Sequence, residues 1–176
     1  HREKVDLKQY VPKTMKIRVL SVDLGVRRGK DHFIDKFKGQ KCYTLYVFKT
    51  AALAKTKIGL NEVSAGDCLL VSPSSPHYFK SKDAEWEYDS ISFKGSDATR
   101  LVSQVGLDCD TVHTPLQTYF IDALLDKIVK ELRAMDMLYE RVIGSTLDEL
   151  LTKVVRFSKQ DFVLSMPDHS QRLRDL

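Results

Sequence analysis

Residues 65–95 decide the fold: they read AGDCLLVSPSSPHYFKSKDAEWEYDSISFKG. Gly66 can adopt the positive φ of a chain reversal, so the stretch opens on a turn. The short apolar run Cys68–Val71 is typical of a strand buried on both faces. Pro73 and Pro76 have no amide hydrogen to donate to a sheet, so they end this strand at a corner. The stretch therefore predicts a turn, a buried strand, a corner and further strands.

The second half of the stretch alternates with a period of two residues, which is the pattern of a β-strand. One face carries Trp86, Tyr88, Ser90 and Ser92, and the other carries Glu87, Asp89, Ile91 and Phe93. One of these faces must line the space that the β-structure encloses. We expect the functional site on that face.

Short strands with turn signals recur about every ten residues, which favours an antiparallel sandwich or barrel. We expect strands at 15–24, 32–37, 42–49, 55–60, 67–72, 77–80 and 86–93. In the first of these, Ile17, Val19 and Ser21 share one face, and Arg18, Leu20 and Val22 share the other. Residues 25–30 are expected to form a basic loop.

The character of the chain changes at Gly95, after which the pattern is helical. Thr114-Pro115 opens a long helix, because proline is tolerated in a first turn. A further helix is expected at 137–158, and its apolar residues recur at spacings of 4, 4, 3, 4 and 3, close to a coiled-coil seam. These residues are Tyr139, Ile143, Leu147, Leu150, Val154 and Phe157. The seam predicts a homodimer interface; the alternative is a helix buried inside one bundle.

The amino-acid composition argues against several classes of function. The 176 residues include 28 basic and 24 acidic ones, a balance that does not indicate nucleic-acid binding by itself. No apolar run approaches the roughly 20 residues that span a bilayer, so no membrane partner is expected. The cysteines, Cys42, Cys68 and Cys109, lack the spacing of a disulfide framework or a zinc site. They are expected to be small buried side chains in a reducing cytoplasm.

Three motifs resemble the N-terminal half of AraC-family transcriptional regulators. They are Ala65-Gly-Asp-x-x-Leu-Val-x-Pro-x-x-x-His77, Trp86-x-Tyr-x-x-Ile-x-Phe-x-Gly95 and Asp31-x-Phe-Ile-Asp-Lys36-x-x-Gly39-x-Lys41-x-Tyr43. The resemblance implies an α+β fold with a cupin-like antiparallel β-barrel of about eight strands, followed by a helical hairpin. It implies an arm at 1–14, an effector-binding barrel at 15–95, a helical dimerisation subdomain at 96–160 and a linker at 161–176. The linker would lead to a helix-turn-helix domain outside this sequence, through which the regulator would bind DNA.

The resemblance also implies where an effector binds. Carried over by motif position, the ligand-binding residues are Lys36, Phe79, Tyr88 and Ser90, and Tyr46 on the aromatic strand completes the expected set. Phe79 and Ser90 stand where an arabinose site has a tyrosine and a tryptophan. A basic residue beside a tyrosine suits a polyol or an anionic small molecule.

Two other function classes remain open. A metal-dependent cupin enzyme needs several converging histidines, but residues 39–60 contain none and His77 stands alone, so no metal, cofactor or metal-dependent activity is expected. The resemblance to AraC-family regulators likewise implies a binding domain and not an enzyme. A metal-independent enzyme such as a sugar isomerase needs inward acids, and only Asp35, Glu87 and Asp89 lie near the site, the last two on the outer face. A ligand-free oligomerisation module would instead fill its barrel with aromatic side chains.

Overall fold

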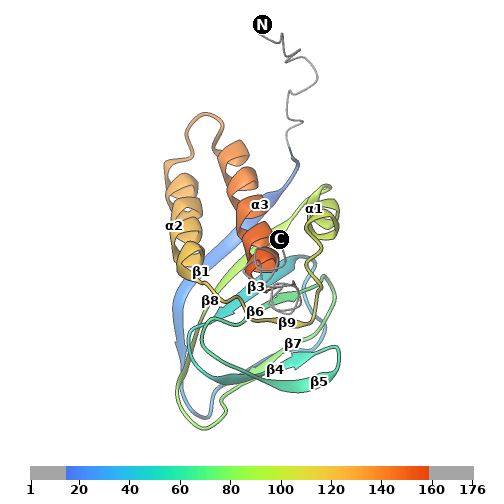
Figure 1. Ribbon diagram of the computed structural model, residues 1–176, viewed down its shortest axis with the longest axis vertical. Coiled ribbons are helices and arrows are strands. Elements are labelled where there is room, and N and C mark those ends of the chain that lie inside the picture. The colour runs from blue at the N-terminus through green and yellow to red at the C-terminus, as the bar shows by residue number, and fades with distance from the viewer. Residues whose placement is uncertain (1–14, 159–176) are drawn as a thin grey trace, which may run out of the picture.

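The computed structural model describes residues 15–158, which form two antiparallel sheets and three helices (Figure 1). The larger sheet has the order β1-β8-β3-β6-β9, and the smaller has the order β2-β7-β4-β5. The strands are β1 (Arg18–Arg28), β2 (Phe33–Lys36), β3 (Tyr43–Phe48), β4 (Ala52–Thr56), β5 (Gly59–Val63), β6 (Cys68–Val71), β7 (His77–Lys80), β8 (Trp86–Lys94) and β9 (Val112–His113). The helices are α1 (Ala98–Val105), α2 (Tyr119–Ala134) and α3 (Tyr139–Ser158).

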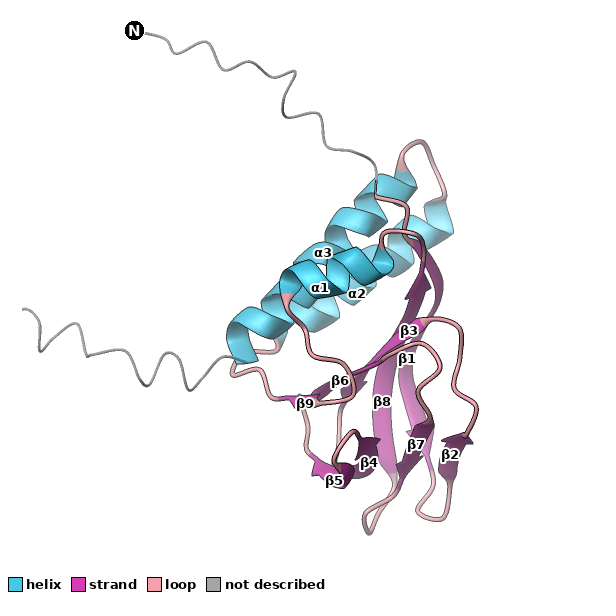
Figure 2. Cartoon of the chain, turned by 90° about the vertical axis from the view of Figure 1, so that its right-hand side faces the viewer, coloured by secondary structure: helices cyan, strands magenta, loops and turns pink. Residues whose placement is uncertain are grey.

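The larger sheet separates two hydrophobic cores. Because successive side chains point to opposite faces, β3 sends Leu45 and Val47 toward the helices and Tyr46 and Phe48 toward the smaller sheet. β8 divides in the same way, with Phe93 on the helical side. All three helices lie on one side of the larger sheet, and the smaller sheet lies beyond its other side (Figure 2).

The predicted α+β class is confirmed, but the sheets are not closed into a barrel. Strands pair only within their own sheets in the described residues, so the β-structure is an open two-sheet sandwich. It has nine strands where about eight were predicted. No described helix is both long and apolar enough to span a membrane. The predicted arm at 1–14 and the predicted linker at 161–176 lie outside the described residues.

β1 departs from its predicted boundaries and alternation. It runs on to Arg28, so most of the expected basic loop is strand. Its pairing with β8 shifts twice, between Val19 and Ser21 and between Asp23 and Val26. At the second shift Gly25 has a φ of 62°, a conformation that glycine adopts readily in a β-bulge. Each bulge changes which side chains face inward, so the simple alternation predicted for this strand is wrong.

The predicted dimer seam on α3 is buried within the chain. Ile143, Leu147, Leu150 and Val154 are at most 3% exposed and belong to the core between the helices and the larger sheet. Tyr139 and Phe157 pack partly buried against the same core. The four buried side chains are already covered within the chain, so they do not offer a surface to a second copy. The buried stripe of α3 packs within its own chain, as in the alternative of a helix inside one bundle, but it lies against the larger sheet as well as the other helices.

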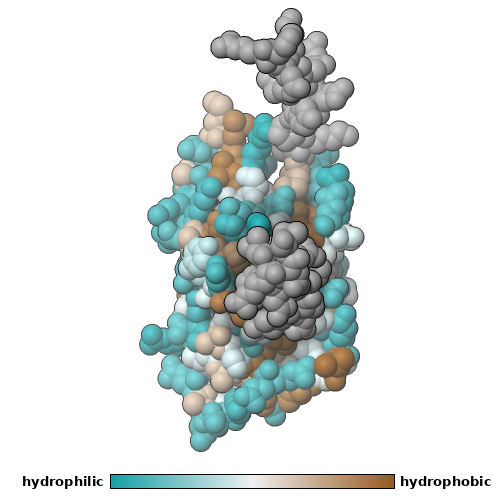
Figure 3. All heavy atoms as spheres, viewed as in Figure 1, coloured by the Kyte–Doolittle hydropathy of each residue, from teal (hydrophilic) through white to brown (hydrophobic). Residues whose placement is uncertain are grey.

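The surface of the helical layer is mixed in character. Hydrophilic residues cover much of the face seen in Figure 3, and hydrophobic residues are exposed at its top, over the turn between α2 and α3. Met135, Met137 and Leu138 on this turn are the exposed apolar side chains. The helical layer therefore exposes an apolar cluster at the end farthest from the smaller sheet.

Candidate functional site

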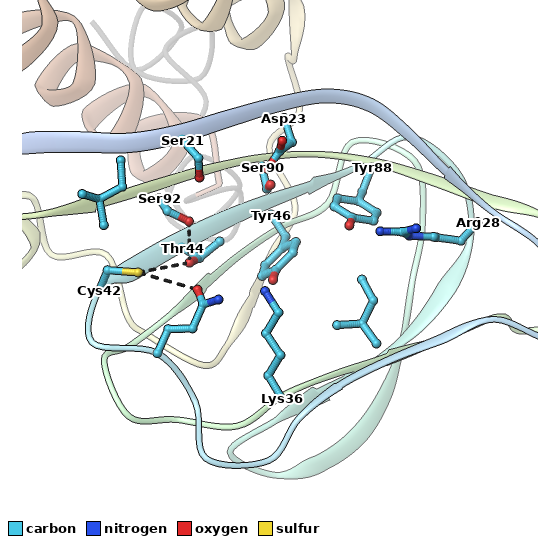
Figure 4. Close-up of a pocket in the computed structure, with 13 residues that line it drawn as sticks. Ser21, Asp23, Arg28, Lys36, Cys42, Thr44, Tyr46, Tyr88, Ser90 and Ser92 are labelled. Carbon is cyan, nitrogen blue, oxygen red and sulfur yellow. Dashed lines mark hydrogen bonds between the residues drawn. The ribbon is translucent and has the colours of Figure 1, made fainter.

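A pocket of about 360 Å³ opens between the two sheets (Figure 4). Its walls come from β1, β2, β3 and β8 and from the segment that leads from β2 to β3. Most of the lining side chains are polar. They are Leu20, Ser21, Asp23, Arg28, Ile34, Lys36, Gln40, Cys42, Thr44, Tyr46, Tyr88, Ser90 and Ser92.

Hydroxyl groups from β3 and β8 form one wall of the pocket. Thr44 and Ser92 face each other across the two strands, and their hydroxyl oxygens lie 2.9 Å apart. Ser90 follows on the same face of β8, opposite Tyr46. Figure 4 shows the hydroxyls of Ser21, Ser90, Ser92 and Thr44 along this side of the pocket. Such a row can both donate and accept hydrogen bonds.

Tyr46 joins the pocket to a buried histidine. Its hydroxyl oxygen lies 2.7 Å from Nδ1 of His77, which is fully buried. Burial, with a smaller effect from the positive charge of Lys36, lowers the pKa of His77 to about 4. Burial also raises the pKa of the Tyr46 hydroxyl. Both groups are therefore neutral at pH 7, and they act as hydrogen-bonding groups rather than as charges.

Two cations reach the pocket from opposite sheets. Arg28 projects from the end of β1 beside Tyr88, and Lys36 projects from β2 toward Tyr46 (Figure 4). The Arg28 Nε atom is buried and has no hydrogen-bond partner among the described residues. Neither Arg28 nor Lys36 forms an ion pair with another described side chain. Asp23 is the one carboxylate among the described residues that line the same pocket, and it forms no ion pair with either cation.

The structure brings most of the predicted ligand residues together. Lys36, Tyr46, Tyr88 and Ser90 all line the pocket. Phe79 does not: it is 1% exposed and packs behind Tyr46, with ring centroids 4.4 Å apart. Phe79 is therefore part of the hydrophobic core between the sheets, and its prediction as a lining residue is wrong.

Several lining residues were missed by sequence reasoning. Thr44 and Ser92 follow from the strand alternation of β3 and β8, so that signal was available. Arg28 and Asp23 lie on the bulged part of β1, where alternation fails. No motif or spacing marks them.

The acidic residues considered for catalysis lie away from this pocket. Asp89 is buried on the helical side of β8, where it accepts a 2.7 Å hydrogen bond from the Gly25 amide and lies beside Lys49. Asp35 and Glu87 do not line the pocket, whereas Asp23 does. Within residues 15–158, no three His, Cys, Asp or Glu side chains group as metal ligands.

Comparison with known proteins gives a family match and several structural neighbours. Residues 61–143 match the family model described as the AraC-like ligand binding domain. No curated protein matches the chain significantly. The AraC-like transcriptional activator CuxR is 12% identical, with a TM-score of 0.44, over 77% of this chain and 51% of its own. ToxT from Vibrio cholerae O395, solved bound to (E)-4-(8-methylnaphthalen-1-yl)but-3-enoic acid, is 14% identical, with a TM-score of 0.50, over 82% of this chain and 58% of its own.

A cupin protein is also among the structural neighbours. The Cupin 2 conserved barrel domain protein from Salinispora arenicola is 16% identical, with a TM-score of 0.31, over 59% of this chain and 98% of its own. The chain spans little more than half the length of the two regulators, and the likeness to ToxT is one of fold. The resemblance to AraC-family regulators expected from the sequence is confirmed by the match of residues 61–143 to the AraC-like ligand binding domain.

Proposed function

We propose that this chain is the effector-sensing domain of an AraC-type transcriptional regulator and that the pocket between its sheets holds the effector. The observation that carries this proposal is the meeting of Lys36, Tyr46, Tyr88 and Ser90 in one polar pocket. The family match supports it, because residues 61–143 include the whole of β8. ToxT was solved with a small organic acid bound, which supports small-molecule binding by this fold.

In this proposal the effector acts by preferring one arrangement of the protein over another. A ligand shifts a conformational equilibrium only by its difference in affinity for the two states. β8 lies between the pocket and the helices, because Tyr88 and Ser90 face inward while Asp89 faces the helical side. DNA would be contacted by a separate helix-turn-helix domain.

The proposed activity is binding without turnover. Acid–base isomerisation needs two suitably placed proton-transfer groups. Among the described residues that line the pocket, Asp23 is the one carboxylate and none is a histidine, so the lining lacks the carboxylate or histidine pair that most often performs such proton transfers. This supports a sensor over a metal-independent sugar isomerase, which is the alternative function. Nuclear magnetic resonance of a bound sugar over hours distinguishes them, because an isomerase converts its ligand and a sensor leaves it unchanged.

Homodimerisation remains part of the proposal, but on a different surface from the predicted seam. The turn between α2 and α3 exposes three large apolar side chains: Met135 is 62% exposed, Met137 87% and Leu138 61%. Clustered exposed apolar side chains favour association. Sedimentation velocity of the wild type and of the double variant Met137→Lys, Leu138→Lys tests this surface. Retention of a dimer by the double variant would place the interface elsewhere.

A thermal-shift screen tests ligand binding in the pocket. Sugars, sugar acids, amino acids, aromatic acids and divalent metals are added singly, because a ligand that binds only the folded state raises Tm. The variant Ser21→Trp adds bulk at the exposed rim of the pocket and is expected to abolish the shift. Ser103→Trp, on the exposed face of α1, is the matched control and is expected to keep it. A shift that survives Ser21→Trp, or a screen with no shift, contradicts the proposal.

A further inference from the structure

We propose that the ligand of this pocket is a compact hydroxylated acid, with its anionic group between Arg28 and Lys36 and its hydroxyls along the wall formed by Thr44, Ser90 and Ser92. This inference rests on the proposed function and specifies its ligand. It follows from how charge and hydroxyl groups are distributed around the pocket.

The two cations without an ion-pair partner among the described residues define the anionic end. Arg28 and Lys36 come from different sheets, yet both line the same pocket and neither has a described acidic partner. The buried Nε of Arg28 lacks a hydrogen bond, and an unsatisfied buried donor is costly. A carboxylate or phosphate oxygen would satisfy it, since guanidinium groups bind such anions through charge-assisted hydrogen bonds.

The segment at the pocket rim carries the same sign of charge. Residues 27–41 contain six Lys and Arg residues against two Asp residues. This segment supplies Arg28, Ile34, Lys36 and Gln40 to the pocket, and Lys38 and Lys41 on it are exposed. Clustered charge of one sign around a cleft raises the local concentration of the opposite ion and its rate of association. The rim therefore favours the approach of an anion.

The remaining wall selects for hydroxyl groups on the ligand. Ser90 is 6% exposed, and its side chain makes no hydrogen bond to a described residue. Thr44 and Ser92 bond to each other and retain further capacity, because each hydroxyl has one donor and two acceptor positions. Leu20 and Ile34 are the aliphatic side chains among the lining residues, so a long apolar chain finds little complementary surface.

The size of the pocket limits the ligand. Its volume of about 360 Å³ lies near the lower end of the roughly 300–1,000 Å³ found for ligand pockets. Asp23, on the hydroxyl side, adds an acceptor for a ligand hydroxyl. A single-ring sugar acid or its open-chain equivalent combines the required size, charge and hydroxyl count.

Isothermal titration calorimetry with matched pairs of compounds tests the inference. D-Galacturonate is compared with D-galactose and D-glucuronate with D-glucose, so that the two members of each pair share a ring and differ chiefly in the acid group. Hexanoate supplies the charge without hydroxyls. We expect at least one sugar acid to bind about tenfold or more tightly than its neutral partner and than hexanoate.

Charge variants locate the anionic end. Arg28→Gln and Lys36→Gln are each expected to weaken binding of the sugar acid about tenfold while leaving weak binding of the neutral sugar unchanged. Lys38→Gln is the matched control, because Lys38 is an exposed neighbour that does not line the pocket. Circular dichroism verifies that each variant is folded.

Each failure separates this inference from the proposed function. One such outcome is a neutral sugar or an aromatic acid that binds as tightly as the sugar acids. If that binding is unaffected by Arg28→Gln but abolished by Ser21→Trp, the ligand is not a hydroxylated acid, whereas the proposal of an effector-sensing pocket stands. Hexanoate that binds as tightly as the sugar acids overturns the role of the hydroxyl wall. If neither sugar acid binds, the inference is overturned, and the wider thermal-shift screen with Ser21→Trp decides the sensor proposal separately.

Discussion

Lys49 forms a salt bridge with Asp89 at the boundary between the larger sheet and the helices, with its Nζ atom 3.2 Å from Oδ2 of Asp89. The same ammonium lies 2.6 Å from Oδ1 of Asp122 on α2. The Asp89 side chain is 6% exposed, whereas that of Asp122 is 72% exposed. The Asp89 carboxylate also accepts a hydrogen bond from the Gly25 amide at the β1 bulge. One cation thus neutralises a buried carboxylate that holds the bulged strand, and it links that carboxylate to the helical layer.

Lys49→Met is expected to lower the free energy of unfolding by about 1–3 kcal/mol, because it leaves the Asp89 carboxylate buried without its cation. Asp122→Asn is the matched variant, since it removes the exposed partner and keeps the buried one. It should cost no more than about 1 kcal/mol. Urea unfolding followed by circular dichroism measures both. Equal losses in the two variants would contradict the dominant role assigned to Asp89.

Leu150 tests the burial of α3. It is fully buried in the core shared by the helices and the larger sheet. Leu150→Ala should therefore lower the free energy of unfolding by about 2–5 kcal/mol, through lost burial and the cavity left behind. Arg156→Ala, on the exposed face of the same helix, should change it by about 0.5 kcal/mol or less.

A charged residue at Leu147 distinguishes a core position from an interface position. Leu147→Asp should abolish cooperative thermal unfolding, because an unpaired carboxylate would be placed in a fully buried site. A folded monomer produced by Leu147→Asp would contradict the burial of this helix and restore the seam as an interface.

The positions of the predicted residues on β8 and α3 show what the spacing of apolar and polar residues can predict. Alternation on β8 placed Tyr88 and Ser90 on one face, and the structure has that face lining the pocket. On α3 the spacing of Leu147 and Leu150 identified the buried face but not its partner. A helix packed on a sheet and other helices needs the same apolar stripe as a helix packed on a second subunit. The apolar pattern therefore indicates burial without identifying the partner surface.

Arg28 illustrates a different limit. Its inward position depends on the extra residue that the bulge between Asp23 and Val26 inserts into β1. In the sequence, Gly25 reads as the start of a loop, because glycine weakens a strand. The pairing with β8 overrides this local preference. Residues on the regular strands were therefore predictable, whereas those beyond the bulge were not.

His77 makes stability depend on pH. Its pKa is about 4 in the folded protein, against 6.5 for an ordinary histidine. Between these values the unfolded chain binds a proton that the folded chain does not, so the free energy of unfolding falls as the pH falls from 6.5 to 4. The loss is on the order of 3 kcal/mol over this window. His77→Gln should have a shallower dependence in urea unfolding at pH 7, 6 and 5, and a slope equal to that of the wild type would contradict the assignment.

At Gly95 the backbone just after β8 packs closely against the backbone of residues 16–17. Its φ is 146°, and a Cβ there would collide with the Lys16 carbonyl oxygen and lie 2.9 Å from the Ile17 Cα. Gly95→Ala therefore combines backbone strain with a clash against main-chain atoms. It should lower the free energy of unfolding by about 3 kcal/mol or more.

Gly29→Ala is the matched control for Gly95, because a Cβ at Gly29 meets nothing within 4 Å. It should change the free energy of unfolding by about 0.5 kcal/mol or less. The segment that precedes β1 also contacts the helical layer. The Lys16 amide donates a 2.7 Å hydrogen bond to the Asp97 carboxylate, beside the start of α1. Gly95→Ala should therefore also speed hydrogen exchange of the amides of β1 and α1. If Gly95→Ala unfolds at the same urea concentration as Gly29→Ala, the close approach of these two backbones does not stabilise the fold.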